Sequence, residues 1–133
     1  MTPTRLLVID DQPSLLYFLR CSIEERWPGC VVDIAQNTNQ AKALLGHWCY
    51  DAILTDYNLQ DGTGLQLAAL ARKHLPAVPV LLMTASPTPL LETRIGHRHS
   101  DIHSLLRKPF DLTQLFEVLE SMPERQNLGT AHG

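Results

Sequence analysis

Acidic, hydroxyl and basic side chains recur where short apolar runs of this sequence end. These residues are Asp10, Asp11, Asp56, Thr84 and Lys108. If the runs are strands of a parallel sheet, all five side chains lie near one edge of it. Each has an ordinary explanation when taken alone, since aspartate caps helices and begins turns. Their recurrence at the same end of successive runs favours one site over independent accidents.

Three carboxylates at one edge of a sheet repel one another. Two carboxylates about 5 Å apart repel by roughly 3 kcal/mol at an effective dielectric constant of about 20. Lys108 supplies one positive charge and cannot offset three negative charges. A divalent cation can, and oxygen ligands favour Mg²⁺ over Zn²⁺. Since Mg²⁺ often shares its coordination shell with phosphate oxygens, the pattern is typical of phosphate chemistry.

The elements that must position these residues alternate between strand and helix along the chain. In chain order they are strand 5–9, helix 13–26, strand 31–35, helix 38–47, strand 52–55, helix 64–74, strand 78–83, helix 89–96, strand 102–106 and helix 112–121. The third and fourth strands are continuously apolar, as in sheets covered on both faces. Five β/α units predict an α/β fold, a doubly wound parallel sheet with helices on both faces.

Length and composition suit one domain. The chain has 133 residues, of which 44% are hydrophobic, and a net charge of −3. We expect no membrane span, because no apolar run approaches about 18 residues, and no signal peptide. We expect no direct nucleic-acid binding, because no basic stripe is present. Cys21, Cys30 and Cys49 match neither a metal knuckle nor a disulfide framework, which favours a cytoplasmic location.

Four motifs together resemble the CheY-like receiver domain of two-component response regulators. They are LLVIDDQPSL, YDAILTDYNLQDGTGLQL, LLMTAS and LRKPFDLTQL, in this order along nearly the whole chain. The resemblance implies a (βα)₅ receiver over residues 1–122 with strand order 2-1-3-4-5. Residues 123–133 are expected to form a polar tail or the start of a linker. The implied role is a signalling switch in a phosphorelay and not a turnover enzyme.

The resemblance also implies a phosphoacceptor and a metal site. Asp56 would accept a phosphoryl group from the phosphohistidine of a histidine kinase or histidine phosphotransfer protein. Asp11 would bind Mg²⁺ directly, and Asp10 would assist through water. Asp56 and the backbone carbonyl of Asn58 would complete the protein ligands.

Further roles belong to the fourth and fifth strand ends. Thr84 would hydrogen-bond a phosphoryl oxygen, and Lys108 would neutralise phosphoryl charge. The bond from Lys108 to Pro109 is commonly cis in this family, which aims the lysine inward. Leu105 stands where receivers often carry an aromatic switch residue, and Gln60 stands where proline is frequent.

The segment GHRHSDIH, residues 96–103, replaces the usual Gly-Ala turn before the fifth strand. It adjoins the face made by helix 4, strand 5 and helix 5, through which receivers contact an output protein or dimerise on phosphorylation. The downstream partner is unknown, and its contact is expected to be unusual. His97, His99 and His103 fit no standard zinc spacing, so an exposed loop is the simpler interpretation.

Two alternatives remain open. One is a pseudo-receiver, an interaction module with this fold and no phosphoryl chemistry. The other is a flavodoxin-like cofactor binder or hydrolase, although the acidic DDQPS after the first strand lacks the glycines of a phosphate loop. The chain would be either a single-domain regulator or the receiver of a longer protein.

Overall fold

A parallel sheet forms the centre of the molecule, and the computed structural model describes residues 2–86 and 102–122. The predicted helix at 89–96 and the tail at 123–133 lie outside these residues. The elements are β1 (Arg5–Ile9), α1 (Pro13–Arg26), β2 (Val31–Ala35), α2 (Thr38–Leu45), β3 (Ala52–Asp56), β4 (Asn58–Leu59), β5 (Gly62–Thr63), α3 (Gly64–His74), β6 (Val80–Thr84), β7 (Ser104–Arg107) and α5 (Leu112–Ser121).

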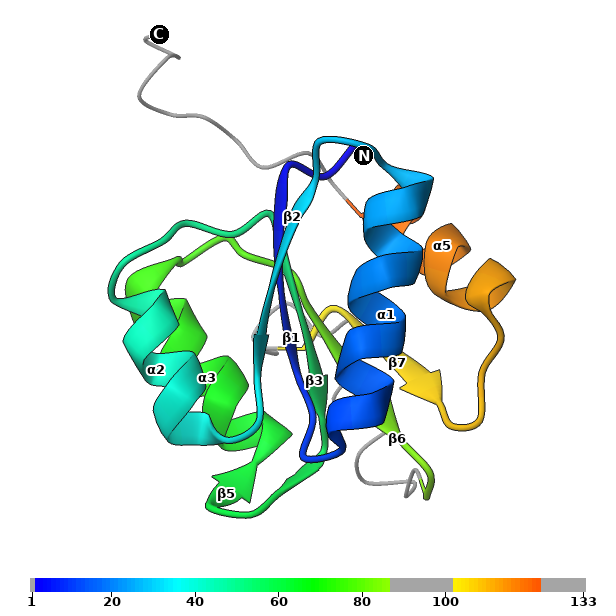
Figure 1. Cartoon of the computed structure of the whole chain (residues 1–133). Coiled ribbons are helices and arrows are strands. Elements are labelled where there is room, and N and C mark those ends of the chain that lie inside the picture. Colours follow the sequence, from blue (N-terminus) through cyan, green and yellow to red (C-terminus); the bar gives the residue numbers. More distant parts are fainter. Residues whose placement is uncertain (1, 87–101, 123–133) are drawn as a thin grey trace, which may run out of the picture.

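The sheet has five parallel strands in the order β2-β1-β3-β6-β7. Counted as the five predicted strands, this is the order 2-1-3-4-5, so the predicted doubly wound fold is confirmed. α1 and α5 cover one face of the sheet, and α2 and α3 cover the other (Figure 1). The carboxyl ends of neighbouring strands therefore open at one edge, where ligands bind in such sheets.

Strand β1 shows how the sequence builds both layers of the core. Leu6 and Val8 pack with the helices α1 and α5, and Leu7 and Ile9 pack with α2 and α3. All four side chains are fully buried. Because side chains alternate across a strand, an apolar run buries residues on both faces, and each contributes about 2 kcal/mol of burial.

Capping residues set where two of the helices begin. Thr63 and Gln66 form a capping box at the start of α3, and Asp111 and Gln114 form one at the start of α5. Each pair satisfies backbone amides that have no partner inside the helix. These caps fix where the chain turns from a site loop into a helix.

The element boundaries differ slightly from the predicted ones. The predicted helix 38–47 ends earlier, at Leu45, and the fourth and fifth strands begin later and reach Thr84 and Arg107. Between the third strand and the next helix, the chain forms the short antiparallel pair β4 and β5, which the sequence pattern did not predict. The three cysteines are free, as expected. Within residues 2–86 and 102–122, no helix has the length and hydropathy needed to cross a membrane.

Candidate functional site: an acidic cluster with one lysine

Asp10 and Asp11 follow β1 and contribute the first two carboxylates. Asp10 is fully buried, although its side chain is acidic. Its backbone N–H donates to Ala35 O at 3.1 Å, and its Oδ1 accepts from the backbone N–H of Gln12 at 2.9 Å. Asp11 is exposed to solvent. The strand end therefore holds one carboxylate rigidly and leaves its neighbour free to approach a ligand.

Asp56 is the last residue of β3, the neighbour of β1 in the sheet. One ligand atom each from Asp10, Asp11 and Asp56 lie within 4.8 Å of one another. Burial raises the pKa of Asp56 above its usual value, and Asp10 adds to this effect while Lys108 opposes it. The negative charge concentrated at this site therefore favours the binding of a further positive charge.

Lys108 brings its ammonium between two of these carboxylates. Its Nζ lies 2.7 Å from Asp10 Oδ2 and 3.4 Å from Asp56 Oδ1. The Lys108–Pro109 bond is cis, as the resemblance implied, and the Lys108 N–H donates to Thr84 O at 2.7 Å. Burial alone would lower the pKa of Lys108, but Asp10 and Asp56 raise it above its usual value. The lysine is therefore charged at neutral pH.

Thr84 ends β6, the strand beside β3, and is almost completely buried. Its Oγ1 accepts the backbone N–H of Ser86 at 3.2 Å, which leaves its own proton available for another acceptor. Leu105 lies on β7 and is partly buried against the core beneath α2 and α3. Thr84 and Leu105 thus occupy neighbouring strands on the far side of Asp56 from β1.

Asn58 lies two residues after Asp56, at the start of β4. The backbone around it is held by two hydrogen bonds: Tyr57 N–H donates to Met83 O at 2.8 Å, and Gly64 N–H donates to Tyr57 O at 2.7 Å. A Cβ on Gly64 would lie 2.6 Å from Asp56 O, so only glycine allows this close approach. The chain after the acidic strand end is therefore tightly placed.

The donor set fits a hard divalent cation. It consists of three carboxylates that are close enough to share one ion. Among the residues that the structure describes, Lys108 is the only amine in ion-pair contact with them. Carboxylate oxygens at this spacing are the ligands that Mg²⁺ prefers. His103 is exposed and contacts Ser104 Oγ at 2.7 Å, whereas His97 and His99 lie outside the described residues. The acidic cluster is the candidate metal centre.

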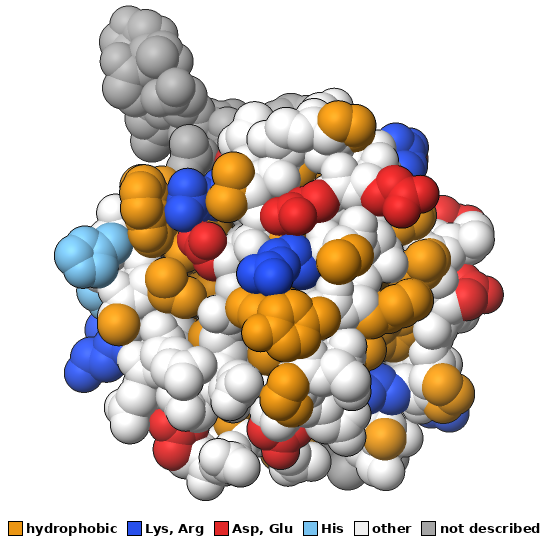
Figure 2. Space-filling model, in the orientation of Figure 1, with side chains coloured by type: hydrophobic (Ala, Val, Ile, Leu, Met, Phe, Trp, Pro, Cys, Tyr) orange, Lys and Arg blue, Asp and Glu red, His pale blue; other side chains and the backbone are white. Residues whose placement is uncertain are grey.

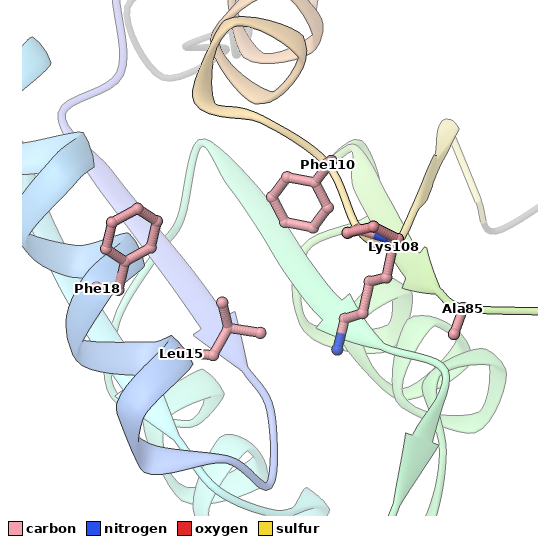
Figure 3. Close-up of a pocket in the computed structure, with 6 residues that line it drawn as sticks. Leu15, Phe18, Ala85, Lys108 and Phe110 are labelled. Atoms are coloured by element: carbon pink, nitrogen blue, oxygen red, sulfur yellow. The ribbon is translucent and has the colours of Figure 1, made fainter.

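An apolar pocket of about 340 Å³, which the sequence did not predict, adjoins this cluster. Its lining residues are Leu15, Phe18, Ala85, Lys108, Pro109 and Phe110. Leu15 and Phe18 project from α1 toward Phe110 across the pocket (Figure 3). Hydrophobic side chains also gather on the outer surface over α1 (Figure 2). The only sequence signal was the pair Tyr17-Phe18, an aromatic pair that the core stripe of α1 does not explain.

Comparison with known proteins identifies the family. The model of the response regulator receiver domain matches residues 6–120. The chain is 30% identical over 132 residues to the response regulator protein PilR of Pseudomonas aeruginosa, covering 96% of this chain and 28% of PilR. It is also 30% identical over 121 residues to the transcriptional regulatory protein TcrA of Mycobacterium tuberculosis, covering 91% of this chain and 46% of TcrA.

Solved structures agree on the fold. A two-component response regulator from Clostridium difficile superposes with a TM-score of 0.77 at 24% identity, covering 89% of this chain and 93% of that one. The response regulator TrrA of Thermotoga maritima, solved in complex with Mg²⁺ and BeF, gives a TM-score of 0.73 at 24% identity, covering 88% of this chain and 96% of that one.

The chain belongs to the response regulator receiver family, a family of signalling domains in two-component systems. The resemblance drawn from the four motifs is confirmed. The chain spans less than half the length of PilR and of TcrA. The family match gives no support to the cofactor-binding or hydrolase alternative.

Proposed function

We propose that this domain is a magnesium-dependent phosphoacceptor whose Asp56 takes a phosphoryl group from a partner phosphohistidine. The observation that carries the proposal is the position of Lys108 Nζ between the carboxylates of Asp10 and Asp56. A fully buried aspartate and a partly buried aspartate share one ammonium there. Such charge density is suited to bringing an anionic phosphoryl group and a cation together.

In the proposed transfer, an oxygen of Asp56 forms a bond to phosphorus as the bond from phosphorus to the imidazole nitrogen breaks. The bonding electron pair leaves with the ring nitrogen. Lys108 stabilises negative charge on the phosphoryl oxygens, and the Thr84 hydroxyl donates a hydrogen bond to one of them. Mg²⁺, held by Asp10, Asp11, Asp56 and the Asn58 carbonyl, would supply further charge neutralisation. Positioning and electrostatics then account for most of the catalysis.

The phosphorylated state would act by shifting a two-state equilibrium. Thr84 and Leu105 lie on adjacent strands, and their rearrangement would transmit the conformational change from the site to the rest of the domain. Leu105 is smaller than an aromatic residue and would repack without swinging a ring. The face predicted for dimerisation includes residues 89–96, which lie outside the described residues, so a phosphorylation-dependent dimer stays a prediction.

Intact-mass measurement after incubation with a small phosphodonor tests the phosphoacceptor proposal. We expect a gain of one phosphate in the presence of Mg²⁺ and none when the metal is removed with a chelator. Since the acidic cluster repels a phosphodonor, removing the cation should stop the transfer. No mass gain with Mg²⁺ present would favour the pseudo-receiver alternative.

We further propose that the pocket bounded by Leu15, Phe18 and Phe110 receives apolar side chains of the phosphohistidine-bearing partner. Lys108 lines this pocket and also contacts Asp56, so the pocket borders the acceptor that the partner must reach. Aromatic residues at the centre of such contacts commonly carry much of the binding free energy.

A Phe18→Ser variant should slow phosphoryl transfer from the cognate kinase or phosphotransfer protein by about tenfold, as expected for a lost contact worth roughly 1.4 kcal/mol. Transfer from a small phosphodonor should be unchanged. Tyr17→Ser is the matched control, because Tyr17 is 52% exposed and Phe18 53%, but only Phe18 lines the pocket. Equal slowing in both variants would contradict this assignment.

A further inference from the structure

The hairpin that follows Asp56 is too short to be stable by itself. β4 and β5 contribute two residues each and pair Asn58 with Thr63 and Leu59 with Gly62. Isolated two-stranded pairs are marginally stable even when longer. Other contacts must therefore fix the backbone between Asp56 and α3.

Three neighbouring elements provide those contacts. On the sheet side, Tyr57 N–H donates to Met83 O at 2.8 Å. On the α3 side, Thr63 is the N-cap of the helix and Gly64 N–H donates to Tyr57 O. On the α2 side, Leu59 is buried in the core beneath α2 and α3. One further side chain, Asp61 at the tip of the hairpin, connects it to α2.

Asp61 accepts hydrogen bonds from the first turn of α2, from residues that precede it by 22 and 23 positions in the sequence. Its Oδ1 accepts the Thr38 N–H at 2.8 Å, and its Oδ2 accepts the Asn39 N–H at 3.1 Å. These amides have no partner within a helix, and the positive end of the helix dipole favours a carboxylate there. The Thr38 amide, with a smaller contribution from the Asn39 amide, holds the pKa of Asp61 below its usual value.

The same turn of α2 carries a second, purely local cap. Asn37 accepts the Gln40 N–H through its side chain at 2.8 Å and does not belong to the hairpin. Asp61 and Asn37 therefore stabilise the same helix end, but only Asp61 also restrains the loop after Asp56. This difference separates stabilisation of a helix from positioning of the site.

We propose that Asp61 is a positioning residue for the cation site, because it ties the tip of the β4–β5 hairpin to α2 and so holds the Asn58 carbonyl in place as a ligand. This inference rests on the proposed function. Asp61 lies three residues after Asn58 and outside the acidic cluster. Residues that orient a metal ligand without touching the metal commonly change its affinity about tenfold or more when they are removed.

Because the coupling is reciprocal, the cation also acts on α2. A ligand that restrains the hairpin makes the bonds from Thr38 and Asn39 to Asp61 more persistent. Amide exchange at Thr38 and Asn39 therefore slows when Mg²⁺ binds the wild-type protein. In an Asp61→Ala variant this slowing disappears, because the connection is gone.

The test measures the dissociation constant of Mg²⁺ by calorimetry, without phosphodonor, in wild type and in Asp61→Ala, Asp61→Asn and Asn37→Ala. Asp61→Ala weakens Mg²⁺ about tenfold. Asp61→Asn, which keeps one oxygen acceptor, has an intermediate effect. Asn37→Ala changes the dissociation constant less than twofold. Amide exchange at Thr38 and Asn39, followed by NMR with and without Mg²⁺, provides the second measurement.

The outcomes separate this inference from the proposed function. Wild-type protein that binds Mg²⁺ while Asp61→Ala binds it equally well overturns the positioning role alone. An equal loss in Asn37→Ala also overturns it, since the effect would then come from α2 in general. Wild-type protein that binds no Mg²⁺ overturns the proposed function together with this inference. If Asp61→Ala does not fold, Asp61→Asn carries the same comparison.

Discussion

An Asp56→Asn variant gains no phosphate from a small phosphodonor and Mg²⁺, whereas the wild-type protein gains one. The amide lacks the anionic oxygen that would attack phosphorus, so the loss is complete and not partial. Intact-mass measurement over a time course checks this result. Phosphate gained by the variant at the wild-type rate would show that another residue is the acceptor.

Two controls keep this result from being a folding artefact. Asp11→Asn removes a carboxylate of the same cluster but leaves the acceptor, so its phosphorylation is slower and recovers at higher Mg²⁺ concentration.

Asp56→Asn should also be more stable than wild type in metal-free buffer at pH 7. Burial raises the pKa of Asp56, so its charged form destabilises the folded state. The added stability of the variant therefore disappears as pH falls below the usual carboxyl range, near pH 4.

A Lys108→Met variant should lose about 2 kcal/mol of unfolding free energy in metal-free buffer, because it leaves a buried carboxylate without its charged hydrogen-bond donor. That carboxylate is Asp10, which is fully buried and lies 2.7 Å from Lys108 Nζ. Its phosphorylation rate should fall about 10²-fold, as when one charge-stabilising donor is removed from an active site. Urea denaturation and mass measurement check the two effects.

A double-mutant cycle isolates the ion pair from other effects of the substitution. Asp10→Asn combined with Lys108→Met removes both charges, so the double variant should be more stable than Lys108→Met alone. Mg²⁺ should narrow the gap between Lys108→Met and wild type, because the cation replaces the missing charge. Strictly additive losses in the cycle would show that the two side chains do not depend on each other.

The alternation of strands and helices could be predicted because each element carries its own pattern, whereas the strand order was implied by the resemblance to receiver domains. Apolar runs such as 52–55 and helical repeats such as 112–121 are local features of the sequence, and right-handed β/α crossovers indicate a parallel sheet with helices on both faces. The predicted ends of the helices and strands were less accurate. The helix predicted to reach residue 47 ends at Leu45, because the last residues of a helix contribute little to its pattern.

Part of the candidate site could also be predicted. Asp10, Asp11, Asp56 and Lys108 were expected to converge, and the structure places the three carboxylates within 4.8 Å, with the lysine against two of them. This convergence follows from the fold class, since the residues after parallel strands share one edge. The chemical roles of these residues stay predictions until they are tested.

Other features have no signature in the local sequence. An Asp-Gly pair such as Asp61-Gly62 is typical of turns, yet the Asp61 carboxylate caps a helix that precedes it by more than 20 residues. Phe18 and Phe110 likewise border one pocket from segments far apart in the chain. The main strands and helices, their succession along the chain and the acidic edge of the sheet could be predicted, because periodicity and strand ends are local features. The loop that each helix contacts and the position of the pocket could not be predicted, because those contacts depend on the packing of elements distant in sequence.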